Sequence, residues 1–473
     1  MVFSSVEFLF LFLPITLLLY YVVPPRFLAW RNLVLLAVSL VFYGWGEPRY
    51  VLLMMATIAV DYVFGYAVGK SVSDGGNRKK AKILLAIAVV INLAILGFFK
   101  YYDFFITNLR LIPGLEGLPL LGLELPIGIS FYTFQALSYV IDVYRRETAA
   151  QKNIVSFGAY VTLFPQLVAG PIVRYKDVND MLDKRDENIP MFASGVRTFI
   201  AGLAKKMLLA NTVGAIWTTL SATPDDSRTV LGAWLGIICY TFQIYFDFSA
   251  YSDMAIGLGK MVGFKFLENF NYPYIARSIS DFWRRWHMSL STWFREYVYI
   301  PLGGNRCSTF KTYRNLFVVW LLTGFWHGAS WNYILWGLYY FVLLVIEKAF
   351  LGKLLAKLPK VLSHIYTLIL VVFGWLLFVV EDISAGFVWL GNMFGKGAVL
   401  YDSGAVYDLL RNLPFFAILI VAATPYPRRL FYKLYEKYGF FRMLVPVGCA
   451  VVLLISTAYV VDSSFNPFLY FRF

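Results

Sequence analysis

Two stretches organise this chain, SISDFWRRWHMSLSTWFREYVYIPLGG (278–304) and WLLTGFWHGASWNYILWGLYYFVLLVIE (320–347). They hold His287 and His327, two of the three histidines in 473 residues, and both histidines have strongly apolar neighbours. An ionisable side chain within an apolar span is costly, so each is a candidate for a functional role. Because forty residues separate the histidines, two neighbouring helical segments can bring them to one buried site.

Helical spacing predicts which side chains accompany each histidine. A helix through the second stretch places Thr323, His327 and Trp331 on one face, because residues four apart lie above one another. A helix through the first stretch places Trp283 on the same face as His287. We therefore expect an aromatic side chain beside each histidine.

Composition assigns the chain to the membrane. Hydrophobic residues make up 59% of it and charged residues only 15%, with a mean hydropathy of +0.65, whereas about a quarter of a soluble domain is charged. The net charge of +14 lies largely in short loops between apolar runs, as expected for cytoplasmic loops, so we expect no nucleic-acid partner. The fold class predicted is an all-α, polytopic integral membrane protein.

Apolar runs predict about ten to twelve transmembrane or re-entrant helices, since about 20 residues are needed to cross a bilayer. We expect one domain, residues 1–473, with its core at 125–347, and we interpret the N-terminal apolar run as a retained first span. The candidate spans are 6–23, 30–46, 50–69, 82–99, 125–143, 154–170, 192–219, 229–259, 315–347 (one long helix or two), 361–380, 411–424 and 441–461.

Loop charge predicts the orientation. The loop 69–81 and the residue after it carry five basic side chains and one acid, so this loop should be cytoplasmic. Three crossings before it place the N-terminus outside.

The middle of the chain departs from a plain helical bundle. The runs 125–145 and 164–175 carry Pro, Gly, Gln and Tyr, and such interruptions persist at membrane depth only when buried in protein or lining a wet cavity. The run 240–260 adds Asp247, which lies deep enough that its ionised form needs a partner. We expect a protein-lined cavity.

The residues leave few options for chemistry. His327 suits a general base near neutral pH, with a structural hydrogen bond as the alternative. His287 either has a role in the site or packs at the membrane interface. Arg285 lies within helical reach of Asp281. It either binds a phosphate-bearing donor or is simply one of the positive charges of the cytoplasmic side. His364 is interpreted as structural. No G-x-S-x-G, H-E-x-x-H, C-x-x-C or Walker A pattern occurs, and we expect no metal site.

The chain resembles the membrane-bound O-acyltransferase (MBOAT) family, in particular its bacterial, alginate O-acetylation-type branch. The resemblance covers most of the chain. It rests on FYTFQALSYVIDVYR, FPQLVAGPIVRY, YFDFSAYSDMAIGLGKMVGFKFLENFNYPY, DFWRRWHMSLSTWFREYVYIPLGGNR and the highly specific LTGFWHGASWNYILWG, together with VFSSVEFLFLFLP at the start and NPFLYFRF at the end.

The resemblance implies that His327 is the catalytic histidine and that His287 fills an upstream site position with an orienting role. It implies a helical membrane body with a funnel on each face, an acyl donor from the cytoplasm and an acceptor from outside. We expect the remaining tunnel-lining, substrate-binding residues to be Asp247, Trp283, Arg285, Trp326 and Asn332.

The function expected is transfer of an acyl group, most simply acetyl, toward hydroxyls of a cell-envelope or exported polysaccharide. The donor would be acetyl-CoA or an acyl carrier, with no tightly bound cofactor. An extracytoplasmic acetyl-transferring protein would be the partner, alongside membrane lipids, in the bacterial cytoplasmic (inner) membrane. The alternatives are D-alanyl transfer to teichoic acid from a carrier protein and a non-catalytic transporter or flippase, against which stands the missing inverted repeat.

Overall fold

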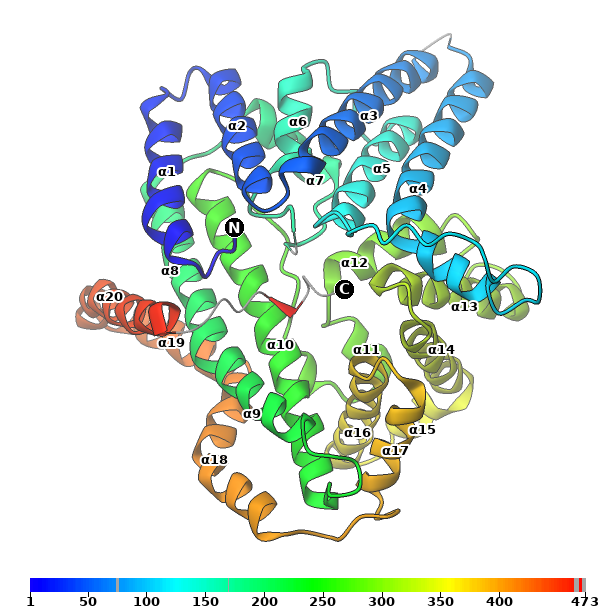
Figure 1. Cartoon of the computed structure of the whole chain (residues 1–473). Coiled ribbons are helices and arrows are strands. Elements are labelled where there is room, and N and C mark those ends of the chain that lie inside the picture. Colours follow the sequence, from blue (N-terminus) through cyan, green and yellow to red (C-terminus); the bar gives the residue numbers. More distant parts are fainter. Residues whose placement is uncertain (74–75, 169, 463–467, 470–473) are drawn as a thin grey trace. The chain divides into compact units, whose positions relative to one another are not determined.

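The computed structural model describes residues 1–73, 76–168, 170–462 and 468–469, and within them the regular secondary structure is helical (Figure 1). The chain forms two compact units, Met1–Ala201 with Tyr251–Leu267 and Gly202–Ala250 with Glu268–Leu469. Helices α8 and α10 pass from one unit to the other. The single-domain prediction stays a prediction. Of the closing stretch NPFLYFRF, only Phe468 and Leu469 lie within the described residues.

The first unit is built on a tight group of helices in which α3 packs on α4 and α5, and α2 packs on α6 (Figure 1). Of the interrupted run, residues 164–168 and 170–174 follow α6 as irregular and largely buried chain, where Gln166 donates to the carbonyl of Tyr160 at 2.6 Å. Burial of the interruption was expected. The helices are α1 (Leu13–Val22), α2 (Leu28–Gly46), α3 (Val51–Val72), α4 (Arg78–Leu109), α5 (Ile129–Arg145), α6 (Ile154–Thr162), α7 (Tyr175–Asp183) and α8 (Ile189–Ala204).

The second unit holds both histidine stretches. Its centre is α14, which packs on α13, α16 and the short α11. The helices are α9 (Asn211–Ser221), α10 (Val230–Met261), α11 (Ile279–Trp283), α12 (Met288–Phe294), α13 (Thr309–His327), α14 (Trp331–Ile346), α15 (Gly352–Leu355), α16 (Lys360–Val379), α17 (Ile383–Met393), α18 (Ser403–Ala422), α19 (Tyr426–Lys437) and α20 (Gly439–Asp462).

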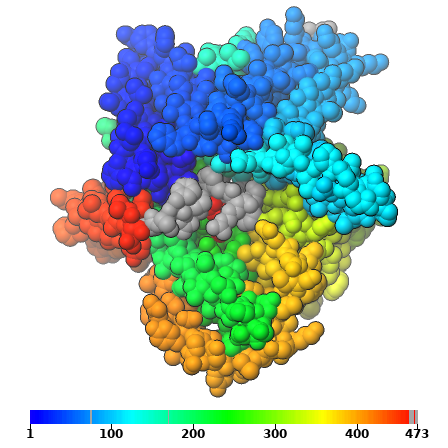
Figure 2. All heavy atoms as spheres, in the orientation of Figure 1, coloured from blue at the N-terminus to red at the C-terminus, as the bar shows by residue number. Residues whose placement is uncertain are grey.

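Nine helices of the described chain are long and apolar enough to cross a membrane. Their outer faces carry large apolar side chains, for example Leu444, Val447, Val451 and Leu454 on α20, the red segment of Figure 2. Lipid is the solvent that makes such exposure favourable. The prediction of a polytopic all-α membrane protein is confirmed. The nine are Leu28–Gly46, Pro48–Val72, Arg78–Leu109, Ile189–Ser221, Val230–Met261, Trp331–Leu355, Lys360–Val379, Ser403–Ala422 and Gly439–Asp462.

Both histidine segments break where a continuous helix was expected. α13 ends at His327 and α14 begins at Trp331, so Trp331 does not share a helix face with Thr323 and His327 as predicted; its side chain is 52% exposed. α11 likewise ends at Trp283, and His287 lies beyond a turn, so the predicted shared face is wrong there too. Local spacing cannot reveal these breaks, because tertiary contacts stabilise them.

Glycines let α13 and α14 cross with their backbones in contact. A Cβ at Gly324 would lie 2.5 Å from the carbonyl oxygen of Tyr333, and one at Gly337 would meet the carbonyl of Trp320. Small residues at such a crossing are the usual device for close helix packing in membranes. The crossing fixes the end of α13, and with it His327.

Candidate active site

The site is built first on the capped start of α11. The Glu347 carboxylate, at the end of α14, accepts from the backbone N–H groups of Ile279 at 2.6 Å and Ser280 at 2.9 Å and from the Ser280 hydroxyl at 2.8 Å. A buried carboxylate at a helix N-terminus satisfies donors that would otherwise lack partners. Glu347 therefore anchors the segment that carries Trp283 and His287.

His287 lies in a strained turn held by a neighbouring segment. Its φ of +42° is in the left-handed region, which costs about 1–3 kcal/mol for a residue other than glycine. Two backbone hydrogen bonds hold the turn on residues 269–271: Met288 N–H donates to the carbonyl of Asn269 at 3.0 Å, and Asn271 N–H donates to that of Arg285 at 2.9 Å. Such strain is typical of functional sites.

The Asn269 side chain sets the tautomer of His287. Its Oδ1 accepts from the backbone N–H of Ser289 at 3.2 Å and from the Ser289 hydroxyl at 2.9 Å, and His287 Nδ1 lies 3.2 Å away. A backbone N–H can only donate, so the amide atom facing it must be the oxygen. The imidazole Nδ1 must then carry the proton and donate, which leaves the lone pair on Nε2.

His287 is neutral in this setting. It lies between α11 and α12, outside the nine candidate spanning helices, and burial lowers the pKa of its imidazole to about 3. Charging the ring would remove an ion from water without a compensating carboxylate, and that penalty favours the neutral form. His287 thus offers a hydrogen-bond acceptor at Nε2 rather than a positive charge.

His327 is the last residue of α13 and sits among aromatic rings. Its ring centroid lies 4.9 Å from that of Trp336 and 5.3 Å from that of Phe378, both edge to face. It is 6% exposed. Edge-to-face packing fixes the plane of an imidazole without using its nitrogens.

The two histidines meet at one indole. Trp326 lies 5.7 Å from the ring of His287 and 5.0 Å from that of His327, centroid to centroid. Phe248, from α10, holds the other side of the His287 ring at 4.7 Å. Two segments forty residues apart thus bring their histidines to one buried indole, as the sequence predicted; that the two form a functional site stays a prediction.

Buried N–H donors surround this pair. Within the part of the chain that the structure describes, the Nε1 atoms of Trp283 and Trp336 and the Nδ2 of Asn269 have no hydrogen-bond partner. An unsatisfied buried donor costs about 1–3 kcal/mol, so native proteins keep few of them unless a ligand or water uses them. The site can therefore donate hydrogen bonds to an oxygen that enters it.

Two of the predicted substrate-binding residues have polar partners within the protein. Asn332 donates from Nδ2 to the carbonyl of Phe378 at 3.0 Å and so positions a ring that packs on His327. Arg285 pairs with Asp281 at 2.9 Å, as the helical spacing predicted, and its side chain is 28% exposed. The ring of Trp283 packs against that of Trp336, with their centroids 5.5 Å apart.

Asp247 has the partner that the sequence required but did not identify. Lys206 Nζ lies 2.5 Å from Asp247 Oδ1, and both side chains are buried. The other carboxylate oxygen accepts from the backbone N–H of Leu469 at 2.7 Å, while Lys206 lies 4.6 Å from the ring centroid of Phe468. This pair holds Phe468 and Leu469 against α10, and its described contacts do not include either histidine.

Sequence reasoning missed several residues on which the site depends. They share one property, a hydrogen bond or ring contact with a residue far along the chain. A polar residue in a mostly apolar run was the available signal for Glu347 and Lys206, whereas Asn269 in NFNYPY carried none. The missed residues are Lys206, Phe248, Asn269, Trp336, Glu347 and Phe378.

Comparison with known proteins identifies the family. The model of the membrane-bound O-acyltransferase family matches residues 145–388. The probable alginate O-acetylase AlgI of Pseudomonas aeruginosa is 46% identical over 400 residues, 84% of this chain and 75% of that protein. The Helicobacter pylori peptidoglycan O-acetyltransferase is 34% identical over 434 residues, 84% of this chain and 81% of that protein.

A more distant relative transfers a different group. The teichoic acid D-alanyltransferase of Streptococcus thermophilus is 32% identical over 244 residues, 48% of this chain and 58% of that protein. The range matched by the family model includes both histidine stretches. This chain belongs to the membrane-bound O-acyltransferase family and is an O-acyltransferase of the membrane.

Proposed function

We propose that this enzyme passes an acetyl group from a cytoplasmic thioester donor toward hydroxyls of a cell-envelope or exported polysaccharide. The observation that carries the proposal is the pair of buried histidines on one indole, in a setting of N–H donors. The relatives that match 84% of this chain are named for O-acetylation of alginate or peptidoglycan.

His327 acts as the general base. It takes the proton of the acceptor hydroxyl as the oxygen attacks the thioester carbonyl; the new C–O bond forms, the C–S bond breaks, and the thiolate that leaves takes up a proton. General-base assistance contributes about 10²–10⁴-fold. Because His327 ends α13, the helix C-terminus stabilises the positive charge that the ring gains.

His287 orients the reacting group rather than exchanging protons. With Nδ1–H held by Asn269, its Nε2 accepts a hydrogen bond from the hydroxyl or from a water that occupies the same position. The carbonyl oxygen becomes negative as it is attacked, and the indole N–H groups of Trp283 and Trp336 are the donors available to it.

The donor and partner follow from this chemistry. The donor is acetyl-CoA or an acylated carrier, with no tightly bound cofactor, and a separate extracytoplasmic protein completes transfer to the polymer. The enzyme then lies in the bacterial cytoplasmic (inner) membrane, with its N-terminus outside. The excess of basic residues in the loop 69–81 supports that orientation.

The test is the acetate that mild base releases from the envelope and exopolysaccharide. Cells carrying the wild-type chain are compared with cells carrying His327→Ala or His287→Ala, at equal membrane levels of each protein. Loss in both variants supports the proposal, and loss only for His327→Ala reduces His287 to a structural role. Unchanged acetate in both variants would refute acetyl transfer through this site.

D-alanyl transfer to teichoic acid is the weaker candidate. The relatives with that name match about half of this chain, against 84% for the acetylating ones. Base-labile D-alanine in the same extracts, lost in His327→Ala, would favour it over acetyl transfer.

A further inference from the structure

α19 joins two spanning helices at one surface of the membrane. α18 ends at Ala422, α19 runs from Tyr426 to Lys437, and α20 begins at Gly439. The 12 residues of α19 form a helix about 18 Å long, whereas the three residues before it span at most about 11 Å and one residue follows it. Because both connections are shorter than the helix, α19 lies along the membrane surface. Nothing in the acyl-transfer chemistry derived above uses it.

One face of α19 is apolar. Leu430 and Leu434 are four residues apart, as are Phe431 and Tyr435, so these four side chains form one apolar stripe. Phe431 also packs on Phe441 of α20, with ring centroids 5.7 Å apart. Leu430 remains 42% exposed. Such a stripe is favourable at a membrane surface, where it dips into the acyl chains below the headgroups.

Arg442 fixes the corner between α19 and α20. Its Nε donates to the carbonyl of Tyr435 at 2.7 Å, and its Nη2 donates to that of Glu436 at 2.7 Å. These carbonyls belong to the last turn of α19, which has no partners for them within the helix. The direction in which the apolar stripe faces is therefore held by the start of the next span.

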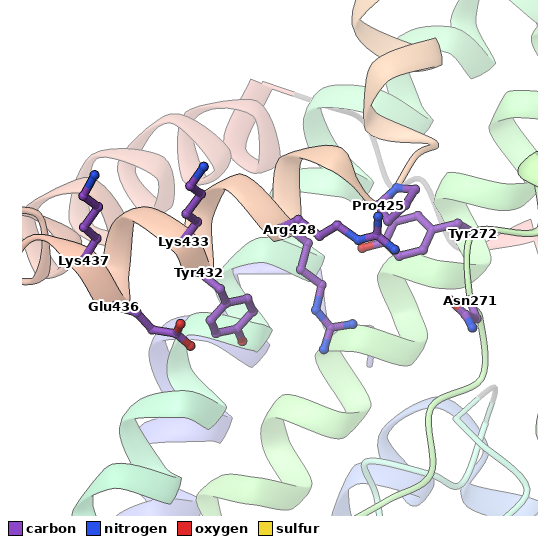
Figure 3. A pocket seen from close by; sticks show the side chains of 9 residues that line it. Asn271, Tyr272, Pro425, Arg428, Tyr432, Lys433, Glu436 and Lys437 are labelled. Atoms are coloured by element: carbon purple, nitrogen blue, oxygen red, sulfur yellow. The ribbon is translucent and has the colours of Figure 1, made fainter.

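The unpaired basic residues of α19 form a second feature, the basic row. It consists of Arg429, Lys433 and Lys437, which are four residues apart and exposed. None of the three makes an ion pair with another described residue. Figure 3 shows Lys433 and Lys437 pointing to one side of the helix and Tyr432 and Glu436 pointing to the other.

The basic row borders the apolar stripe. Lys433 follows Leu430 by three residues, and Lys437 follows Leu434 by three, so each lysine neighbours a leucine on the helix surface. A lysine in this position covers apolar surface with its stem and places its ammonium group at the level of the headgroups. This arrangement is typical of helices that lie in a membrane interface.

The space beside the row is open. A basic hollow of about 740 Å³ lies between the polar side chains of α19 and residues 271–272 (Figure 3). Arg428, which also lines it, pairs with Glu268 at 3.1 Å and is thereby neutralised. The positive charge that no protein group compensates is that of the basic row.

Charge also indicates which surface of the membrane α19 occupies. Residues 423–438, which contain α19, carry four Lys and Arg residues and one acid, whereas residues 380–402, before α18, carry one base and three acids. Cytoplasmic loops hold the excess of Lys and Arg. The cytoplasmic leaflet is also the one whose anionic lipids attract basic clusters on amphipathic helices.

We propose that α19 is an interfacial helix whose basic row binds the phosphates of anionic phospholipids, such as phosphatidylglycerol, in the cytoplasmic leaflet. Charge complementarity supplies the attraction, and the spanning helices on either side keep the row at headgroup level. An acidic soluble protein would match the row but would leave the apolar stripe beside it in water. The inference adds a lipid-binding surface to the proposed function and does not depend on it.

The experiment measures lipid binding by the purified full-length protein in neutral detergent. Native mass spectrometry follows a titration with phosphatidylglycerol or phosphatidylcholine, and the readout is the ratio of the two Kd values. The variant is Arg429→Gln/Lys433→Gln/Lys437→Gln, since all three side chains are exposed and glutamine is a good helix former. Its charge-conserving counterpart is Arg429→Lys/Lys433→Arg/Lys437→Arg.

A matched control removes the same charge from another basic loop. Lys353→Gln/Lys357→Gln/Lys360→Gln changes three exposed lysines of the same unit outside α19. Residues 347–360 carry four lysines and one acid, so the loop is as basic as that of α19. The control therefore separates binding at the basic row from the general attraction of a cationic protein for anions.

We expect the glutamine variant to lower the preference for phosphatidylglycerol over phosphatidylcholine at least tenfold. Each Lys or Arg near an anionic surface strengthens binding about fivefold, and three are removed. The charge-conserving variant and the control should keep the preference of the wild type. Equal loss in the glutamine variant and the control would overturn the inference, and so would an unchanged preference in the glutamine variant.

A soluble phosphate ligand gives a different result. If inorganic phosphate or pyrophosphate binds the wild type and the glutamine variant loses it, while the preference between the two lipids is the same in both proteins, the row serves a soluble anion and the lipid assignment falls. Because lipid binding is measured without turnover, neither result depends on which acyl group the enzyme transfers.

Discussion

Replacing Asn269 should disable the enzyme without touching either histidine. Oδ1 of Asn269 accepts from His287 Nδ1, Ser289 N–H and the Ser289 hydroxyl at 3.2, 3.2 and 2.9 Å. Asn269→Ala removes the oxygen that accepts from two buried N–H groups, and losing such a hydrogen bond costs about 1–3 kcal/mol. The hydroxyl can turn to another acceptor and costs less.

The expected loss of activity depends on the free energy of the hydrogen bond that His287 loses. In the wild type, the hydrogen bond to Asn269 stabilises the Nδ1-protonated ring in its working orientation relative to other tautomers and rotamers. Without Asn269 this free-energy difference falls by about 1–3 kcal/mol. A change of about 1.4 kcal/mol corresponds to a factor of ten in population. We therefore expect kcat to fall about 10- to 100-fold, with little change in the KM of the acyl acceptor, because His287 orients and does not bind alone. The assay is acetate transfer by purified protein, with membrane level and thermal stability as controls.

Asn269→Asp is the matched variant. A carboxylate keeps the acceptor oxygen for all three donors but stabilises the imidazolium, so it raises the pKa of His287 from its lowered value of about 3. Asn269→Asp should be active at pH values above the raised pKa of His287. Below that pKa it should lose activity, because Nε2 becomes protonated. The pH–rate profile of the wild type should show no such loss from His287. Full activity in Asn269→Ala, or an Asn269→Asp profile identical to wild type, would refute the orienting role.

Three further outcomes test the packing and the base. His327→Gln keeps the size of the side chain but removes the base, so kcat should fall by about 10²–10⁴-fold with normal membrane insertion; wild-type turnover would argue against general-base catalysis. Gly324→Ala, whose Cβ would lie 2.5 Å from a carbonyl oxygen of α14, should lower stability by about 1–3 kcal/mol, whereas Gly97→Ala, with open space around its Cβ, should not; thermal unfolding in detergent compares the two. Lys206→Met removes the cation that pairs with the buried carboxylate of Asp247 and should lower the free energy of unfolding by about 3–5 kcal/mol. Adding Asp247→Leu should recover most of that stability. A double variant as unstable as Lys206→Met alone would contradict the ion-pair account.

Much of this protein could be predicted from the order of its residues. Apolar runs long enough to cross a bilayer predicted six of the nine candidate spanning helices of the described residues to within three residues at each end, because partition into lipid depends on local composition. The rarity of ionisable groups in apolar runs singled out His287 and His327. The motif around His327 indicated the family that the comparisons confirmed.

The tertiary structure decided what the two histidines can do. The helix break after Trp283 is stabilised by hydrogen bonds to residues 269–271, and the break after His327 by the glycine crossing of α13 and α14; both are contacts between separate segments of the chain. The tautomer of His287 depends on an asparagine eighteen positions earlier in the chain. Hydropathy reports whether a side chain leaves water, whereas a hydrogen-bond partner is chosen only when the chain is packed. The sequence by itself therefore determined the membrane class and the candidate residues, and only the fold determined their protonation, orientation and neighbours.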